Sequence, residues 1–421
     1  MKVLIISHNP VSHQSNMGKT FLSLFSGFGK EALCQLYIYP VIPDVDRCGS
    51  YYRVTDKEAL RSRFRPGTIG GEVDKGRIRP DQEQYENRKD RRLYRDPRNK
   101  SALRRLLRDA VWHRADWYNA ELRKWLDRER PTCIFVAPGA AGFLYDMALK
   151  IAGERKLPIV TYLCDEFYFL KAAGGPLERY RLKKLRKKME QLLASSQHLV
   201  VISRELAEAY RVFGRPTTVL MTGAEITPAK QAHSEPGRNT VCYFGNVRCG
   251  RCRPLGEVAA ALERINRRQG TRYRLKVYTA ERDEKILAYL AQFPALELAG
   301  YVTGAEYEQS LKRAGVLLHV ESFEPDCVER VKHSVSTKIA DYLASGVPVV
   351  AYGPEGIASM AHLKRWDCAF SATEPERLED TLLRAMTETA ERQRVAENGL
   401  RAAERCHDRE AVSNALREIL G

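Results

Sequence analysis

The feature that most constrains the fold is a rhythm of short apolar runs, each followed by a stretch with helical spacing, in both halves of the chain. In the first half the predicted strands are residues 2–7, 33–39, 133–137, 159–163, 199–202 and 218–221, and residues 20–28 have the pattern of a helix. Strands that alternate with helices form parallel sheets with both faces covered. The first half therefore predicts a doubly wound α/β domain.

The same rhythm starts again after a polar stretch at residues 227–239. The predicted strands are then residues 241–244, 275–278, 296–298, 316–320 and 347–352, with a helix at 254–268. A chain of 421 residues also exceeds what one hydrophobic core usually supports. We predict an α/β protein with two Rossmann-like, doubly wound domains that face each other across a ligand-binding cleft.

The patterns also suggest domain boundaries. We expect a first domain at residues 1–225, a linker at 226–238, a second domain at 239–400, and a C-terminal helix at 401–421 that packs back on the first domain. Within the first domain the rhythm fails after about residue 44, where several glycines stand among many charges. We expect an insertion over about residues 44–130, and such loops often serve binding.

Charge and hydropathy bear on partners and compartment. The formal net charge of +16 favours a polyanionic partner: nucleic acid, an anionic membrane face or a phosphorylated substrate. No apolar run reaches the roughly 18 residues that span a bilayer. The opening run at residues 2–6 turns polar too soon for a secretory signal. We expect a cytoplasmic protein.

The ten cysteines are scattered along the chain rather than packed into a short domain. Those in apolar, strand-like runs are interpreted as reduced core thiols: Cys34, Cys133, Cys164 and Cys242. Cys249 and Cys252 form a CxxC motif. Because no second cysteine pair or histidine pair stands at zinc-site spacing, the motif does not favour a metal.

Three segments together point to a known family. Residues 334–351, SVSTKIADYLASGVPVVA, resemble the donor-binding signature of the retaining glycosyltransferases with the GT-B fold, in which a helix carrying a carboxylate ends at glycine and leads into a Pro-Val-Val strand. Residues 243–247, YFGNV, with Arg251 are similar to the glycine-rich opening of that family's donor domain. Residues 199–203 and 219–223 are similar to the close of its acceptor domain. The matches are spread through most of the chain.

The resemblance implies a function of the bacterial polysaccharide-biosynthesis type. The chain would transfer a hexose from a nucleotide diphosphate donor to a polysaccharide, lipid-linked or other glycan acceptor, with retention. We expect no metal and no cofactor, because protein cations and a helix terminus would stabilise the diphosphate. A sugar-nucleotide epimerase or a non-catalytic nucleotide-sugar binder of the same fold is the alternative.

The donor helix predicted from Thr337 to Ser345 can be capped by Ser336 and ended by Gly346. Its free N–H groups at Thr337 and Lys338 and its positive dipole end would face a pyrophosphate. An ordinary capped helix that packs on the core is the alternative.

Carboxylates are expected around the donor nucleotide and sugar. Asp341 stands where the family has the glutamate that holds the ribose, and a carboxylate there can accept bonds from both hydroxyls. His333 stands where the family has the glutamate that reads the donor sugar. Glu321 and Glu324, just past the strand at 316–320, are candidates to replace it, and solvated loop carboxylates are the alternative. The expected site also includes Ser334.

Cations and glycines complete the expected donor site. Arg251 matches the basic position that neutralises the departing diphosphate, and Arg248 is close enough to assist. A solvated basic turn is the alternative. Gly245 and Asn246 belong to the same segment. Gly18 is expected in the loop after the opening strand, where the family uses glycine to let backbone approach phosphate and acceptor.

Residues 18–20, GKT, also imitate the end of a Walker motif, but His13 occupies the place of its first glycine, which excludes a P-loop. The predicted catalytic residues are Arg251 together with Asp165 and Glu166, which follow a strand in the region where many relatives place a histidine. Their carboxylates could orient or deprotonate the acceptor hydroxyl. A helix cap is the alternative reading of the aspartate, and His8 and His13 are rival candidates.

Two basic segments suggest other partners. Residues 88–130 interleave Arg and Lys with Tyr94, Trp112, Trp117, Tyr118 and Trp125, which would suit nucleic acid, although a packed helix with a basic outer face explains the pattern better. Residues 179–188 carry a dense positive run on an expected helix. It could hold the protein peripherally on the anionic inner membrane face, or form a solvated face above the apolar stripe Leu182, Leu185, Met189 and Leu192.

Overall fold

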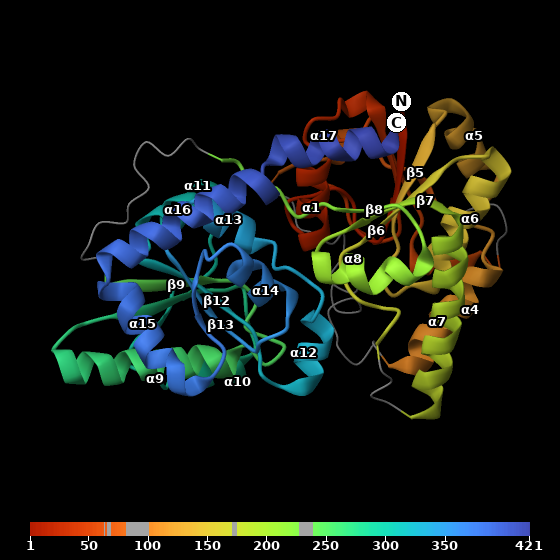
Figure 1. The fold of residues 1–421 in the computed structure, drawn as a ribbon. Coiled ribbons are helices and arrows are strands. Elements are labelled where there is room, and N and C mark those ends of the chain that lie inside the picture. The colour runs from red at the N-terminus through yellow and green to blue at the C-terminus, as the bar shows by residue number, and fades with distance from the viewer. Residues whose placement is uncertain (63, 65–68, 81–100, 171–174, 227–238) are drawn as a thin grey trace. The chain divides into compact units, whose positions relative to one another are not determined.

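The computed structural model describes residues 1–62, 64, 69–80, 101–170, 175–226 and 239–421 (Figure 1). The chain divides into two compact units. Unit 1 comprises Met1–Leu220 and Glu410–Gly421, and unit 2 comprises Met221–Arg409. Apart from Ile226, the expected linker at 226–238 lies outside the described residues.

Unit 1 is built on an eight-stranded sheet with the order β4-β3-β2-β1-β5-β6-β7-β8. Neighbouring strands are parallel except for β4, which runs antiparallel to β3. The strands are β1 (Val3–Ser7), β2 (Leu33–Tyr37), β3 (Ser50–Arg53), β4 (Gly71–Glu72), β5 (Cys133–Ala137), β6 (Ile159–Leu163), β7 (Ser196–Val201) and β8 (Thr217–Val219). Every residue of β1, β2, β5 and β6 is buried, as in a parallel sheet covered on both faces.

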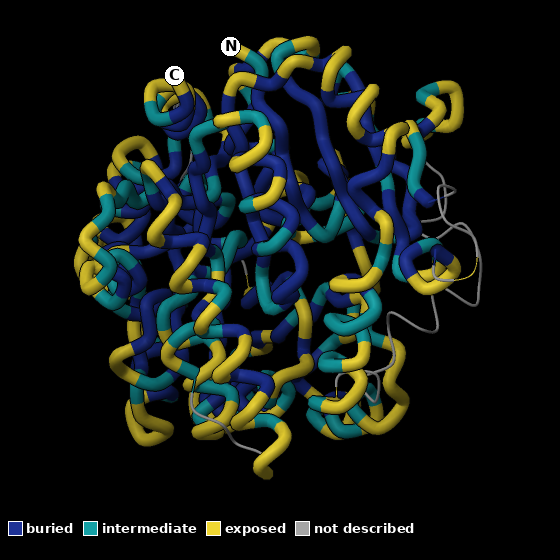
Figure 2. Tube along the Cα trace, turned by 90° about the vertical axis from the view of Figure 1, so that its right-hand side faces the viewer, coloured by how far each residue is buried: buried dark blue, intermediate teal, exposed yellow. Residues whose placement is uncertain are grey.

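Successive side chains of β1 enter two different hydrophobic cores, one on each face of the sheet. Leu4 and Ile6 belong to the core under α4–α8, whereas Val3 and Ile5 belong to the core under α1 and α17. The helices of unit 1 are α1 (Asn16–Leu24), α2 (Asp56–Arg61), α4 (Ala102–Arg114), α5 (Ala120–Glu129), α6 (Gly142–Arg155), α7 (Pro176–Ser195), α8 (Arg204–Tyr210) and α17 (Arg409–Leu420). Figure 2 shows the strands as buried and the outer sides of the helices as exposed.

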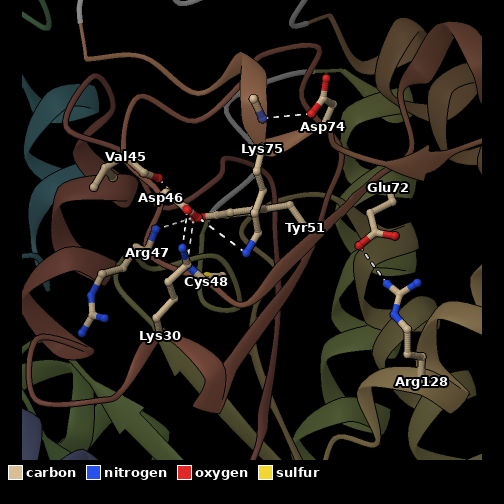
Figure 3. Close-up of polar contacts among 11 residues, drawn as sticks. Lys30, Val45, Asp46, Arg47, Cys48, Tyr51, Glu72, Asp74, Lys75 and Arg128 are labelled. Atoms are coloured by element: carbon tan, nitrogen blue, oxygen red, sulfur yellow. Dashed lines mark hydrogen bonds and ion pairs between the residues drawn. The ribbon is translucent and has the colours of Figure 1, made fainter.

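The expected insertion at residues 44–130 needs correction, because part of it builds the sheet. β3 extends the parallel sheet beside β2, and β4 closes that edge. Polar contacts fix the surrounding loop (Figure 3): Asp46 pairs with Lys30, and the Tyr51 hydroxyl accepts hydrogen bonds from the N–H groups of Arg47 (2.8 Å) and Cys48 (3.0 Å). Residues 81–100 lie outside the described part of the chain.

Helices α4 and α5 occupy the rest of that segment and bury its aromatic residues. The core under α4–α8 contains Trp112, Trp117, Tyr118 and Trp125. Their rings are therefore not presented for base stacking. Tyr94 lies outside the described residues. The packed-helix interpretation is therefore confirmed for the four aromatic residues that the structure describes.

Unit 2 contains a six-stranded, fully parallel sheet with the order β11-β10-β9-β12-β13-β14. The strands are β9 (Thr240–Phe244), β10 (Arg274–Tyr278), β11 (Leu296–Leu298), β12 (Val316–Val320), β13 (Val349–Tyr352) and β14 (Phe370–Ala372). From β9, the strands β10 and β11 follow on one side, and β12, β13 and β14 follow on the other. This is a doubly wound order with its switch point between β9 and β12.

Helices cover both faces of this sheet. One core lies under α9 (Cys252–Gln269), α10 (Glu284–Leu290) and α15 (Leu378–Thr387). The other lies under α11 (Gly304–Arg313), α13 (Lys338–Ala344), α14 (Ala358–Arg365) and α16 (Thr389–Cys406), with α12 (Pro325–Val331) beside it. The predicted α/β class with two doubly wound sheets is confirmed. No helix in the described ranges has both the length and the apolar character to cross a bilayer.

The chain passes between the units twice, after Leu220 and after Arg409. The segments of unit 2 next to these two crossings pair with each other. Ala224 and Asp408 form a parallel β-bridge. The side chain of His407 lies between the Thr222 carbonyl oxygen (2.9 Å from Nδ1) and His362 (3.0 Å between the Nε2 atoms). Burial lowers the pKa of His407 to about 4, so the imidazole is neutral near pH 7.

The returning chain then forms α17 on unit 1. Val412, Leu416 and Leu420 are buried in the same core as Val3 and Phe25. The region expected as one helix at 401–421 is thus the end of α16 followed by α17, with the chain passing from unit 2 to unit 1 between Arg409 and Glu410.

Candidate functional site

The switch point of unit 2 lies where several of the residues predicted for the donor come together. In open parallel sheets, ligands bind outside the carboxyl ends of the strands where the strand order reverses. The loop after β9 carries residues 245–251, and the loop after β12 begins at Glu321. Arg251 and Glu321 are 70 residues apart in sequence. Their loops are nevertheless neighbours, because β9 pairs with β12.

Arg251 and Glu321 form a two-pronged ion pair across this switch point. The Arg251 Nε donates to Glu321 Oε2 at 2.9 Å, and Nη2 donates to Oε1 at 3.0 Å. The side chains are only 18% and 5% exposed. Burial opposes the charge of Arg251, but the adjacent Glu321 carboxylate more than offsets it and raises the pKa of the guanidinium. The pair therefore fixes a permanent cation at the strand ends.

Lys338 approaches the same region. A Cβ added to Gly245, which has φ 153°, would lie 2.9 Å from Lys338 Cε and 3.1 Å from its Nζ. Glycine therefore lets the lysine lie across the loop backbone. Burial lowers the pKa of His319 to about 4; the charge of Glu321 opposes this shift, and the charges of Arg251 and Lys338 favour it. Both cations thus act on one place at the end of β12.

The expected Ser336 cap is wrong. Helix α13 begins at Lys338, its N-cap residue Thr337 already has helical angles (φ −58°), and no side chain caps it. The Ser336 N–H donates to Ser359 Oγ in α14 at 3.2 Å. Gly346 follows the helix with φ 67°, as predicted.

Asp341 lies in α13 and accepts a hydrogen bond from the Tyr307 hydroxyl at 3.0 Å. The Tyr307 ring meets Phe244 edge-on at 5.2 Å, and Phe244 stacks on Tyr278 at 4.5 Å. Burial and the neighbouring Asp341 raise the pKa of Tyr307 well above its usual value, so the tyrosine remains a donor. This contact orients the carboxylate that the sequence assigned to the ribose.

The remaining predicted donor residues have separate positions. His333 and Ser334 are half-buried in the segment between α12 and α13, and the Ser334 carbonyl oxygen accepts from Ser359 Oγ at 3.2 Å. Glu324 is exposed at the start of α12. Of the two glutamates considered after β12, Glu321 is therefore the one that pairs with Arg251.

Arg248 pairs with a different carboxylate. Its Nε and Nη2 donate to Glu281 at 2.6 and 2.7 Å, and these bonds lower the pKa of Glu281 to about 2. Asn246 shapes the turn: its Oδ1 accepts from the Arg248 N–H at 2.7 Å, and its carbonyl oxygen accepts from Tyr243 at 2.7 Å. Arg248 thus faces the loop after β10.

In unit 1, Gly18 lies inside α1 rather than in the preceding loop, which corrects the expectation. Its N–H donates to the capping Ser15 Oγ at 3.0 Å. A Cβ at Gly18 would lie 2.4 Å from the Ser12 carbonyl oxygen, so glycine is needed where the loop folds against the helix. The residue supports the loop that follows β1.

The two predicted catalytic carboxylates have different surroundings. Asp165 is exposed just past the end of β6. Glu166 is buried, and its Oε1 accepts from the N–H groups of Tyr168 (2.6 Å) and Phe169 (2.7 Å) and from the Tyr210 hydroxyl (3.3 Å). Glu166 therefore holds its own loop, and Asp165 is the carboxylate presented to solvent.

His8, a rival candidate, lies at the switch point of unit 1, directly after β1 and beside β5. Its Nε2 is 3.2 Å from the Pro138 carbonyl oxygen, and burial lowers its pKa to about 3. His13 lies further along the same loop, 3.6 Å from Asp44. The sequence-based site did not include Glu281, Tyr307 or His319. Of these three, only His319 could have been noticed in the sequence, because it is a polar residue inside an apolar strand.

Comparison with known proteins bears on the family and the fold. Residues 253–420 match the family described as "Glycosyl transferase-like". No curated protein sequence matches the chain. The chain is similar in structure to HepE from Anabaena in complex with UDP, with 12% identity, a TM-score of 0.62, and 100% and 99% of the two chains covered.

Two further structures are similar over whole chains. Sucrose-phosphate synthase from Thermosynechococcus elongatus has 11% identity and a TM-score of 0.63, with 100% and 98% covered. The UDP-forming α,α-trehalose-phosphate synthase from Burkholderia vietnamiensis has 13% identity and a TM-score of 0.61, with 100% and 99% covered. At such identity the likeness establishes a fold. The chain therefore has the GT-B glycosyltransferase fold, and its residues 253–420 match the glycosyl transferase-like family.

Proposed function

We propose that the chain is a glycosyltransferase that binds a UDP-hexose in unit 2 and transfers the sugar, with retention, to a glycan or lipid-linked acceptor. The observation that carries the proposal is the Arg251–Glu321 pair with Lys338 beside it at the switch point. UDP is the favoured nucleotide because HepE, which is similar in structure, was solved both with UDP and with UDP-glucose. Retention and a polysaccharide-type acceptor rest on the sequence resemblance.

The proposed chemistry follows from where charge develops. As the bond between the sugar and the diphosphate breaks, negative charge builds on the leaving diphosphate. Arg251 is already oriented by Glu321 and needs no reorganisation to stabilise that charge. Lys338 adds a second cation. Asp341, oriented by Tyr307, would accept the ribose hydroxyls.

The acceptor side is proposed to use unit 1. Asp165 is the exposed carboxylate at the end of β6, where it could orient an acceptor hydroxyl or stabilise positive charge at the reacting carbon. His8 is neutral near pH 7 and is better suited to hydrogen bonding than to carrying charge. We assign the catalytic role to Asp165.

The first experiment is a thermal-shift screen of the full chain against UDP, GDP, ADP and their hexose conjugates. A ligand at 100 times its Kd stabilises the native state by about 2.7 kcal/mol. Turnover of the stabilising nucleotide-sugar is then measured with and without glycan acceptors. Transfer to an acceptor supports the proposal. Interconversion of the sugar without acceptor indicates an epimerase, and binding without either reaction indicates a non-catalytic binder.

A peripheral membrane location is part of the proposal. On α7, Leu182, Leu185 and Met189 are buried, which explains how the helix docks on its own unit. Arg181, Arg186 and Lys188 make contacts within the unit: to Glu178, to the Tyr168 and Leu170 carbonyl groups, and to Asp146 respectively. The exposed basic side chains are then Arg179, Lys183, Lys184 and Lys187.

Exposed apolar side chains accompany these charges. Leu177 and Tyr180 on α7 and Leu103 and Leu107 on α4 are large and exposed. Basic residues near an anionic surface contribute about 1 kcal/mol each. Co-sedimentation with phosphatidylserine vesicles should decrease with salt and on changing Lys183, Lys184 and Lys187 to Gln. The absence of binding at low salt would rule this location out.

A further inference from the structure

The CxxC motif lies in the loop that carries the donor-site cation, and the proposed function makes no use of its thiols. Cys249 is exposed, and Cys252 is the first residue of α9, a helix of 18 residues. Gly250 and Arg251 stand between the two cysteines. Two thiols therefore flank the residue that pairs with Glu321.

The two cysteines belong to one continuous turn-and-helix segment. Residues 248–251 form a continuous turn in which the Arg251 N–H donates to the Arg248 carbonyl oxygen at 3.4 Å, and the chain then enters the helix. Cys249 has φ 57°, which is uncommon for a residue other than glycine. Cys249 lies inside this turn and Cys252 follows it directly, with the Cys-x-x-Cys spacing found in dithiol–disulfide pairs.

A third thiol lies near the motif. A Cβ on Gly250 would lie 2.2 Å from Ser322 Oγ, so the turn packs against the loop after β12. That loop leads into α12, where the Cys327 thiol donates to Glu324 at 3.6 Å. Cys249 and Cys327 are close enough to interact electrostatically. Cys327 is therefore the competing partner that an experiment must exclude.

A metal does not account for these thiols. Within the described ranges of the chain, no group of three or more His, Cys, Asp and Glu side chains is placed to hold a metal ion. Burial raises the pKa of Cys252, whereas Cys249 is open to solvent. An exposed thiol three residues before a partly buried one suits sequential attack, in which the first meets a dissolved disulfide and the second resolves the product.

We propose that Cys249 and Cys252 form a reversible disulfide by exchange with a low-molecular-weight disulfide such as glutathione disulfide. The Cys249 thiolate attacks one sulfur of glutathione disulfide, which forms a mixed disulfide and releases one glutathione thiolate. The Cys252 thiolate then attacks the Cys249 sulfur and releases the second glutathione. Each departing thiolate takes up a proton equivalent to the one lost by a cysteine. The two protein thiols lose two electrons in total, and glutathione disulfide gains them.

The exchange would act on the loop that holds Arg251. The disulfide closes a ring that contains Gly250 and Arg251. The backbone of this loop therefore has less conformational freedom in the oxidised protein than in the reduced one. The exchange itself does not depend on the proposed function, since it requires only the two thiols and their surroundings.

The test uses the full chain, fully reduced and then incubated without air in mixtures of glutathione and glutathione disulfide. Free thiols are alkylated before tryptic digestion. Trypsin cleaves after Arg251, so a disulfide joins two separate peptides, residues 249–251 and 252–264. In the parent protein we expect this linked pair to accumulate with glutathione disulfide and to disappear on adding dithiothreitol.

Three variants make the test specific. Cys252→Ser should hold a stable glutathione on Cys249, because the resolving thiol is absent. Cys249→Ser should give neither the linked pair nor an adduct at Cys252. Cys327→Ser is the matched control and should behave as the parent does. Unfolding midpoints of all variants are compared, so that exposure by unfolding is recognised.

Three outcomes would overturn the proposal. One is a stable glutathione adduct on Cys249 in the parent protein, which would show that Cys252 cannot reach it. Another is a disulfide between Cys249 and Cys327. The third is unchanged free thiol at both positions when glutathione disulfide is in excess.

Discussion

Replacing Arg251 tests the central element of the proposed site. Arg251→Ala removes a guanidinium that donates to Glu321 at 2.9 and 3.0 Å, and it leaves a carboxylate that is only 5% exposed without that partner. Loss of one preorganised group that stabilises developing charge costs about 10²–10³ in rate, or about 2.7–4 kcal/mol. We therefore expect kcat/KM for sugar transfer to fall by at least about 10².

The same substitution also has a cost in stability, which must be separated from the effect on rate. Removing one partner of a buried ion pair destabilises a protein by about 3–5 kcal/mol, because the remaining charge is buried alone. Adding Glu321→Gln removes that charge. The double variant should regain stability without regaining rate, whereas Arg251→Lys should keep the charge and lose the two-pronged geometry.

Arg253→Ala, two residues further on in α9, is the matched control. Its side chain is 71% exposed and lies 3.6 Å from Glu257 one helical turn away, a contact of little energetic value. The assay is UDP release at donor concentrations below KM, with the folded fraction of each variant measured by denaturant titration. If Arg251→Ala stays within about threefold of the parent while folded, or if the double variant regains the rate, the assigned role is refuted.

Four further predictions concern the remaining groups. Asp341→Ala should weaken binding of free UDP by about 10- to 100-fold, as expected for a hydrogen bond to a charged group, and equal affinity in calorimetry would contradict the ribose role. Asp165→Asn should lower transfer without changing donor affinity, and if Glu166→Gln is the crippled variant instead, the assignment moves by one residue. Chelation with EDTA should leave donor binding and turnover unchanged, and activity that is lost and then restored by magnesium or manganese would disprove metal independence. The folded pKa of His407 is about 4 against 6.5 for the free side chain, so the unfolded chain binds more protons between these values. Its contribution to stability is full above about pH 6.5 and falls by about 2 kcal/mol by pH 5. His407→Gln should flatten that part of the pH dependence in denaturant titrations at pH 7 and 5.

The strands predicted best from the sequence are those whose residues are continuously apolar. β5 and β6 were predicted with their observed bounds, because parallel strands buried on both faces leave uninterrupted apolar runs. β3 was missed, since it has four residues and is flanked by charges, although its Tyr51 and Tyr52 are almost wholly buried. β4 and β14 have only two and three residues, too few to show a periodic pattern.

The site was predicted less completely, because its contacts join distant segments. Arg251 and Glu321 were both candidates, but their pairing depends on β9 lying beside β12, which strand patterns alone do not reveal. The Ser336 cap failed because the helical backbone begins one residue later, at Thr337, where no side chain caps it. Glu281 stands in an ordinary charged loop and acquires significance only through Arg248.

The position of α17 has a consequence for how the protein is made. Leu416 and Leu420 complete a core whose other members include Val3 and Phe25, and Ser413 accepts a hydrogen bond from the Gly27 N–H at 2.9 Å. During synthesis, residues 1–220 emerge from the ribosome long before residues 410–421, which unit 1 needs to cover one face of its sheet. The part of that face that α17 covers stays open while all of unit 2 is translated, and it is a natural place for a chaperone to bind. An isolated unit 1 would therefore have to carry residues 410–421 on a fused linker to bury the same core.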